Sequence, residues 1–92
     1  MSAPPATVAQ LRSALERALL PSELEIIDDS AAHVGHAGAR DGGHYKVRVV
    51  AEVFRGRSQL ERHRLVYAAV APLMARTVHA LNIVARAPGE SP

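Results

Sequence analysis

The segment that most constrains the fold runs from Tyr45 to Val53, because apolar and polar side chains alternate along it. Successive side chains of a β-strand point to opposite faces of a sheet, so this alternation predicts a strand with one buried face. The residues expected on the buried face are Tyr45, Val47, Val49 and Ala51. The residues expected on the other face are Lys46, Arg48 and Glu52. A chain of 92 residues has room for one hydrophobic core, so the strand belongs to a single small domain.

Two other segments are also predicted to be strands. In the segment 23–28, Leu24 and Ile26 would face the core. In the segment 78–86, the alternation would place Leu81, Ile83 and Ala85 on one face and Asn82, Val84 and Arg86 on the other. Residues 29–43 join the first two strands, contain several glycines and show no usable period. We interpret them as a long loop, and loops of this length in a compact domain are often functional.

A first helix is predicted at residues 7–20, before Pro21. Thr7 and Gln10 have the spacing of a capping box, in which a hydroxyl and an amide side chain satisfy free backbone donors. The apolar stripe of this helix would consist of Val8, Leu11, Leu15, Ala18 and Leu19. Residues 1–6 and 89–92 are expected to be flexible ends.

A second capping box, at Ser58 and Glu61, predicts another helix start. The stripe expected to be buried on this helix is Leu60, Leu65, Val66, Ala69, Val70 and Leu73. Pro72 has no amide hydrogen and its ring clashes with the preceding turn, so we expect two helical pieces, at 58–70 and 72–76.

The predicted order is helix, strand, strand, helix, helix, strand, within one domain at residues 7–88. Each strand has one apolar side and each helix one apolar stripe. A three-stranded sheet covered on one face by helices buries all of these surfaces, which predicts an α+β fold.

Composition excludes several classes of function. The chain has no cysteine and therefore offers neither disulfides nor thiolate ligands. It has no tryptophan, one phenylalanine and two tyrosines, too few for an aromatic platform that stacks several bases. No apolar run approaches the ~18 residues of a membrane span, and the first residues lack the features of an export signal, so a soluble cytoplasmic protein is expected. No nucleophile motif or phosphate-binding loop is present, so we do not expect an enzyme.

The five histidines are His33, His36, His44, His63 and His79. None of them forms a closed zinc motif with a neighbouring histidine or cysteine. Considered alone, His79 resembles a partly buried histidine at the start of a strand. His44 and His63 are interpreted as packing or solvated residues.

Basic residues gather around the predicted helix start at Ser58: Arg55, Arg57, Arg62, His63 and Arg64. Free backbone amides at a helix start together with arginines can bind a phosphate group. The same residues can also form an ordinary solvated face, and their pattern does not decide between the two interpretations.

Three segments together resemble the signature of the BolA family. They are Arg62-His63-Arg64-Leu65-Val66-Tyr67, Val78-His79-Ala80-Leu81 and, upstream, Phe54-x-Gly56-x-Ser58. The resemblance covers roughly residues 8–88 and implies a fold similar to a type II KH domain. It also implies a role in iron sensing or iron–sulfur cluster trafficking.

In that family the histidine at the position of His79 ligates a shared [2Fe–2S] cluster, and a second ligand comes from the loop between the first two strands. That loop contains His33 and His36, and counting from either end favours a different one. The implied partner is a monothiol glutaredoxin with glutathione, which supplies the sulfur ligands that this chain lacks.

Two alternatives remain open. The resemblance also implies a DNA-binding transcriptional regulator that reads DNA through the helix 58–70 and its arginines. The other alternative is a scaffold that binds the glutaredoxin without metal.

Overall fold

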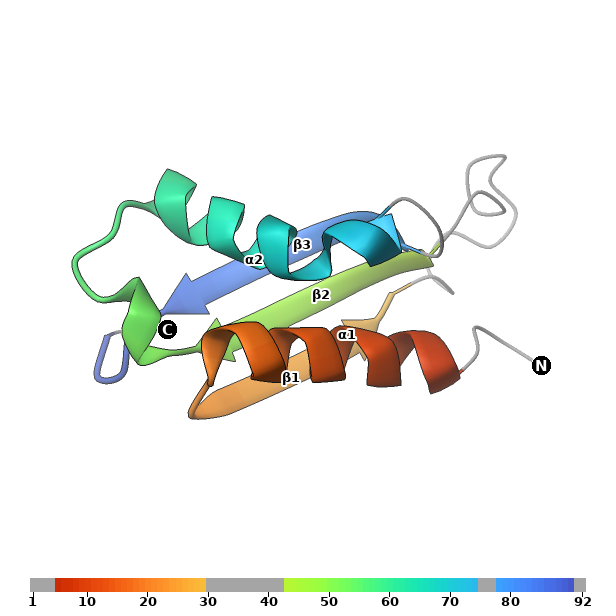
Figure 1. Cartoon of the computed structure of the whole chain (residues 1–92), viewed down its shortest axis with the longest axis horizontal. Coiled ribbons are helices and arrows are strands. Elements are labelled where there is room, and N and C mark those ends of the chain that lie inside the picture. Colours follow the sequence, from red (N-terminus) through yellow and green to blue (C-terminus); the bar gives the residue numbers. More distant parts are fainter. Residues whose placement is uncertain (1–4, 30–42, 75–77, 91–92) are drawn as a thin grey trace.

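The computed structural model describes residues 5–29, 43–74 and 78–90, and for Pro5, Ala6 and His79 it describes the backbone only. Its elements follow in this order: α1 (Pro5–Leu19), β1 (Glu23–Asp28), β2 (Gly43–Val50), the 3₁₀ turn η3 (Glu52–Phe54), α2 (Gln59–Met74) and β3 (Val78–Arg86). The two helices run in opposite directions across one face of a three-stranded sheet (Figure 1). No helix in the described part of the chain is long and apolar enough to cross a bilayer.

The sheet has the order β1-β2-β3, with β2 in the centre. β1 pairs with β2 antiparallel, and β2 pairs with β3 in parallel. A parallel pair needs a long crossover, and α2 provides it. The α+β fold with helices on one face of a three-stranded sheet is therefore confirmed.

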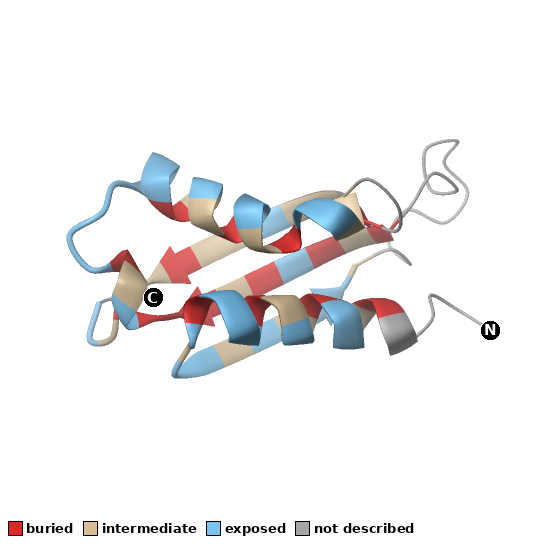
Figure 2. Cartoon of the chain, viewed as in Figure 1, coloured by how far each residue is buried: buried red, intermediate tan, exposed pale blue. Residues whose placement is uncertain are grey.

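The core lies between the sheet and the helices, and buried positions concentrate on the surfaces that face each other (Figure 2). All four residues predicted for the inner face of the central strand are buried: Tyr45, Val47, Val49 and Ala51. The helices and β3 contribute Leu11, Leu15, Leu19, Val66, Val70, Val78 and Ala85. Leu24 and Ile26 of β1 pack against this cluster as predicted.

The predicted bounds of the first helix and of the central strand differ from those in the structure. α1 begins at Pro5, so Thr7 lies inside the helix, where it is buried, instead of capping it. Proline is favoured in the first helical turn, where its missing amide hydrogen has no partner to lose. β2 begins at Gly43 instead of Tyr45 and ends at Val50 instead of Val53, and the chain then turns through η3, which places Phe54 in the core.

The capping box of α2 is confirmed. The amide of Ser58 donates to Oε1 of Glu61 at 2.8 Å, and the amide of Glu61 donates to Oγ of Ser58 at 3.1 Å.

The prediction that Pro72 breaks this helix is wrong, because α2 continues to Met74. Pro72 lies close to the helix end and removes the single bond to the carbonyl of Ala68, while its fixed φ suits a helix. Leu60 was predicted to be buried but is 60% exposed, because it lies in the first turn on the side away from the sheet.

Candidate functional site

The first residues of β2 and β3 lie side by side at one end of the sheet. Gly43 pairs with Val78 and His44 pairs with Ala80, so β3 contains one more residue than β2 between the two pairs. That extra residue is His79. Such an irregularity is a β-bulge, a feature that re-aims a side chain and is frequent beside functional sites.

Close packing explains the glycine that opens β2. A Cβ atom on Gly43 would overlap the ring of Tyr45, which is buried in the core. The segment that contains His33 and His36 lies outside the described residues, but its two anchors are described. It follows Asp29, whose amide donates to the carbonyl of His44 at 2.7 Å, and it precedes Gly43.

His44 is the histidine that sequence reasoning set aside and that the register brings next to His79. Paired strands lie about 4.8 Å apart, so the backbones of His44 and His79 are within roughly 6 Å of each other. His44 is half-buried and lines a shallow hollow of about 190 Å³ on the face of the sheet opposite the two described helices. The signal available in the sequence was its position at the start of the predicted central strand.

Among the described residues, no group of three or more histidine, cysteine, aspartate or glutamate side chains is arranged to hold a metal ion. A metal at the starts of β2 and β3 would therefore draw ligands from the loop between β1 and β2 or from a partner. Among the metal ligands predicted from the sequence, His79 is the one whose backbone is described, and it lies at the start of β3.

The predicted basic cluster lies at the opposite end of the molecule, around η3 and the start of α2 (Figure 1). Arg62 bonds to the carbonyl of Ala85, which lies six residues after His79 in β3. At about 3.3 Å per residue, the two candidate sites are about 20 Å apart. They are therefore separable by mutation.

Arg62 differs from the other members of the basic cluster because it is buried. Its guanidinium group donates to the carbonyls of Arg57 and Ala85, at 3.0 and 3.1 Å, and to both carboxylate oxygens of Glu90. These interactions use its donors inside the domain. Arg62 therefore has a structural role in this fold, and its predicted contact with nucleic acid stays a prediction that these internal bonds disfavour.

The carboxylate of Glu90 is likewise fixed by several hydrogen bonds. Hydrogen bonds from Arg62 and from the amide of Ala87, with the nearby charges of Arg62 and Arg86, lower the pKa of Glu90 from 4.5 to about 2. Gly89, at φ 87°, allows the turn that brings this carboxylate back onto α2.

The other basic residues are more accessible. Arg55 is exposed, forms an ion pair with Glu52 and donates to the carbonyl of Pro88 at 3.1 Å. Arg57 is exposed and donates to the carbonyl of Val53 at 2.9 Å. Arg64 is exposed on α2, and His63 is half-buried. Arg57 and Arg64 are thus the arginines near the helix start that are exposed without a direct ion pair among the described residues, although the charges of both help to lower the pKa of Glu61.

Comparisons with known proteins agree on one family. The sequence model of the family described as BolA-like protein matches residues 15–90. BolA-like protein 1 of Homo sapiens is 44% identical over 82 residues, which cover 89% of this chain and 58% of that protein. The DNA-binding transcriptional regulator BolA of Escherichia coli K12 is 38% identical over 74 residues, which cover 80% of this chain and 69% of that protein.

The fold has solved counterparts as well. The BolA domain of SufE1 from Arabidopsis thaliana superposes with a TM-score of 0.79 at 40% sequence identity, covering 90% of this chain and 93% of that domain. Several curated relatives are much longer than the matched region, and the chain spans 24% to 59% of their length.

Proposed function

This chain belongs to the BolA-like protein family, and we propose that it is a non-catalytic interaction module that binds a monothiol glutaredoxin and bridges a shared [2Fe–2S] cluster. The proposed role is iron sensing or cluster trafficking. In this assembly His79 and one loop histidine, His33 or His36, are the ligands from this chain.

The observation that carries this proposal is the position of His79 as the extra residue beside the start of β2. The loop that contains His33 and His36 is anchored at Gly43, the strand partner of the residue before His79. His36 lies seven positions before Gly43, and an extended chain of seven steps spans roughly 24 Å. Both loop histidines are therefore within chain reach of His79.

The donor set supports the same proposal. Neutral imidazoles can replace two thiolates on one iron of a [2Fe–2S] cluster, and the cluster then supplies an iron centre of raised reduction potential. This chain has no cysteine, so sulfur ligands for the other iron come from the glutaredoxin and glutathione. His44 is a further imidazole within reach and belongs in the same test.

The experiment is to mix the chain with a glutaredoxin that carries its cluster, isolate the complex, and measure iron, acid-labile sulfide and binding affinity. His79→Ala, His33→Ala, His36→Ala and His44→Ala are compared with wild type. We expect His79→Ala and one loop variant to lose cluster stability. Unchanged cluster content in His79→Ala would overturn the ligand assignment, and loss of metal with retained binding would favour the metal-free scaffold.

A second candidate function is DNA binding, favoured by the exposed Arg57 and Arg64 near the start of α2. The relative from Escherichia coli is described as a DNA-binding transcriptional regulator. Phosphate contacts make affinity fall with salt, so we expect a duplex-binding anisotropy assay to give a steep dependence on salt.

Each of Arg57→Ala and Arg64→Ala should reduce the slope of log affinity against log salt by about one. Arg48→Ala, on the open face of the sheet, is the matched control. Equal slopes in all of these proteins would remove this candidate.

A further inference from the structure

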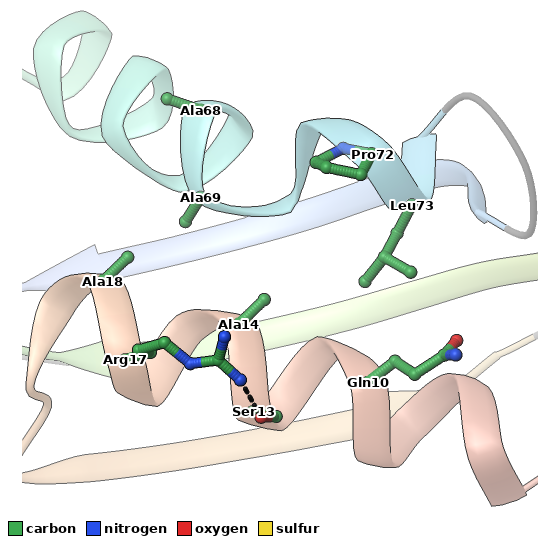
Figure 3. Close-up of a pocket in the computed structure, with 9 residues that line it drawn as sticks. All are labelled: Gln10, Ser13, Ala14, Arg17, Ala18, Ala68, Ala69, Pro72 and Leu73. Atoms are coloured by element: carbon green, nitrogen blue, oxygen red, sulfur yellow. Dashed lines mark hydrogen bonds between the residues drawn. The ribbon is translucent and has the colours of Figure 1, made fainter.

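A groove of about 550 Å³ lies between α1 and α2, on the side of the helices away from the sheet (Figure 3). One wall belongs to α1 and is lined by Gln10, Ser13, Ala14, Arg17 and Ala18. The other belongs to α2 and is lined by Ala68, Ala69, Pro72 and Leu73. The groove is neither of the two sites described above.

The two walls differ in chemistry. On α1, Gln10, Ser13 and Arg17 follow the spacing i, i+3, i+7, which places three polar side chains along one edge. On α2, the lining side chains are all apolar, and the ring of Pro72 forms part of the wall (Figure 3). An occupant that matches both walls needs one apolar face and one polar edge.

The polar edge carries positive charge. Nε and the terminal nitrogens of Arg17 have no carboxylate partner among the described residues, and one of them donates to Oγ of Ser13 at 3.0 Å. Arg64 lies one helical turn before Ala68, at the same end of the groove, and adds positive charge there, although part of its charge acts on the carboxylate of Glu61.

The acidic side chains of α1 and α2 already have partners within this chain. α1 contains Glu16, which pairs with Arg12 at 3.7 Å. α2 contains Glu61, whose carboxylate accepts the capping bond from the amide of Ser58. Among the described residues of the two helices, Arg17 is therefore left without a carboxylate partner, and an acidic group on an occupant of the groove complements its charge.

The dimensions fit a helix. The α1 wall extends from Gln10 to Ala18, and at 1.5 Å per residue this is about 12 Å, or roughly two helical turns. Alanines at positions 14, 18, 68 and 69 keep the walls low, and small side chains allow a third helix to approach to the usual 8–10 Å. Pro72 costs α2 a backbone bond yet adds a rigid apolar surface to the groove.

We propose that this groove is the docking site for an amphipathic helix of a partner protein, with apolar residues at i, i+3 and i+7 and carboxylates along the edge that faces α1. The proposal is independent of cluster binding, because the groove uses neither His79 nor the loop histidines.

The test uses a synthetic peptide of sixteen residues that is held helical by a hydrocarbon staple. It carries leucines at positions five, eight and twelve, glutamates at four, eleven and fifteen, and alanine elsewhere. A second peptide has lysines in place of the glutamates. Each is titrated into ¹⁵N-labelled protein, and amide shifts give both the affinity and the surface contacted.

We expect the glutamate peptide to shift amides of α1 and α2 that border the groove and to bind about tenfold more tightly than the lysine peptide. Arg17→Glu should reverse this preference, and Ala18→Gln, which adds bulk at an exposed position, should weaken binding of both peptides. Lys46→Glu makes the same change of net charge on the open face of the sheet and should leave the preference unchanged.

Three results would overturn the proposal. The first is equal affinity of the two peptides for wild type. The second is that shifts map to the open face of the sheet, or that none occur at millimolar peptide. The third is that groove resonances move with protein concentration alone, which would make a second copy of this chain the occupant.

Discussion

The guanidinium group of Arg62 donates hydrogen bonds to both carboxylate oxygens of Glu90, at 2.6 and 3.0 Å, across 28 residues of sequence. Arg62 lies in the first turn of α2, and Glu90 lies in the turn that follows β3. Arg62 also donates to the carbonyl of Ala85. These contacts connect the start of α2, the crossover helix, to the end of β3, the strand that follows it in sequence.

Arg62→Ala should lower the melting temperature clearly, because it removes a buried guanidinium group and the hydrogen bonds that it donates to Glu90, Ala85 and Arg57, leaving Glu90 with the amide of Ala87 and Ala85 with Arg86 as donors. The matched control is Arg48→Ala, which removes a pair with Glu23 whose two side chains are 38% and 61% exposed. Exposed pairs contribute little, so this control should change the melting temperature only slightly. Thermal unfolding followed by circular dichroism measures both, and equal shifts in the two variants would contradict the structural role of Arg62.

The pair with Glu90 also predicts a dependence of stability on pH. The pKa of Glu90 in the folded state is about 2, below its ordinary value of 4.5, so this group favours folding above pH 4.5. That contribution is lost as pH falls from 4.5 towards 2. Glu90→Gln lacks it, so the difference in melting temperature between wild type and Glu90→Gln should shrink over this interval.

Other carboxylates titrate in the same range, since hydrogen bonds also lower the pKa values of Glu52 and Glu61. They are present in both proteins, and the difference between the two melting curves cancels them. A difference that stays constant from pH 7 to pH 2.5 would show that Glu90 is not held in this way.

Gly43→Ala should destabilise the domain by about 1–3 kcal/mol, because the added methyl group overlaps the buried ring of Tyr45. Gly56→Ala is an informative comparison, since Gly56 has open space around it and a φ of 76°. It should cost only the backbone strain of about 1–2 kcal/mol. Chemical denaturation measures both, and the steric explanation predicts that Gly43→Ala and Tyr45→Leu combine less than additively.

Ser58→Ala should destabilise the domain by about 1 kcal/mol, because the amide of Glu61 loses its capping oxygen. Glu61→Gln retains an acceptor for the amide of Ser58 and should have a smaller effect. Urea denaturation tests the order of the two variants. A larger loss in Glu61→Gln would mean that charge, and not the cap, stabilises this helix start.

Local patterns were sufficient to predict much of the fold. The alternation from Tyr45 to Ala51 identified the central strand and its buried face, and the Ser58 and Glu61 pair identified the start of α2. Each pattern depends only on residues that are close together in the sequence, so one physical rule is enough to interpret it. The strand Val78–Arg86 was predicted with its exact bounds for the same reason.

Tertiary contacts account for what was missed. Leu60 follows the apolar pattern of α2, but its exposure depends on which side of the helix meets the sheet. Arg62 looked like a member of a basic surface cluster because its partner Glu90 is 28 residues away. The proximity of His44 to His79 follows from the register between β2 and β3, which no local pattern reports.

The central claim is that the imidazole of His79 is a ligand of a [2Fe–2S] cluster that this chain shares with a glutaredoxin. The most direct measurement is visible circular dichroism of a cluster-loaded monothiol glutaredoxin titrated with wild type, His79→Ala or His63→Ala, with far-ultraviolet melting curves to verify that each variant is folded. The account predicts that wild type and His63→Ala change the cluster's charge-transfer bands in the same way and that His79→Ala does not. A folded His79→Ala protein that produces the wild-type spectrum would contradict it.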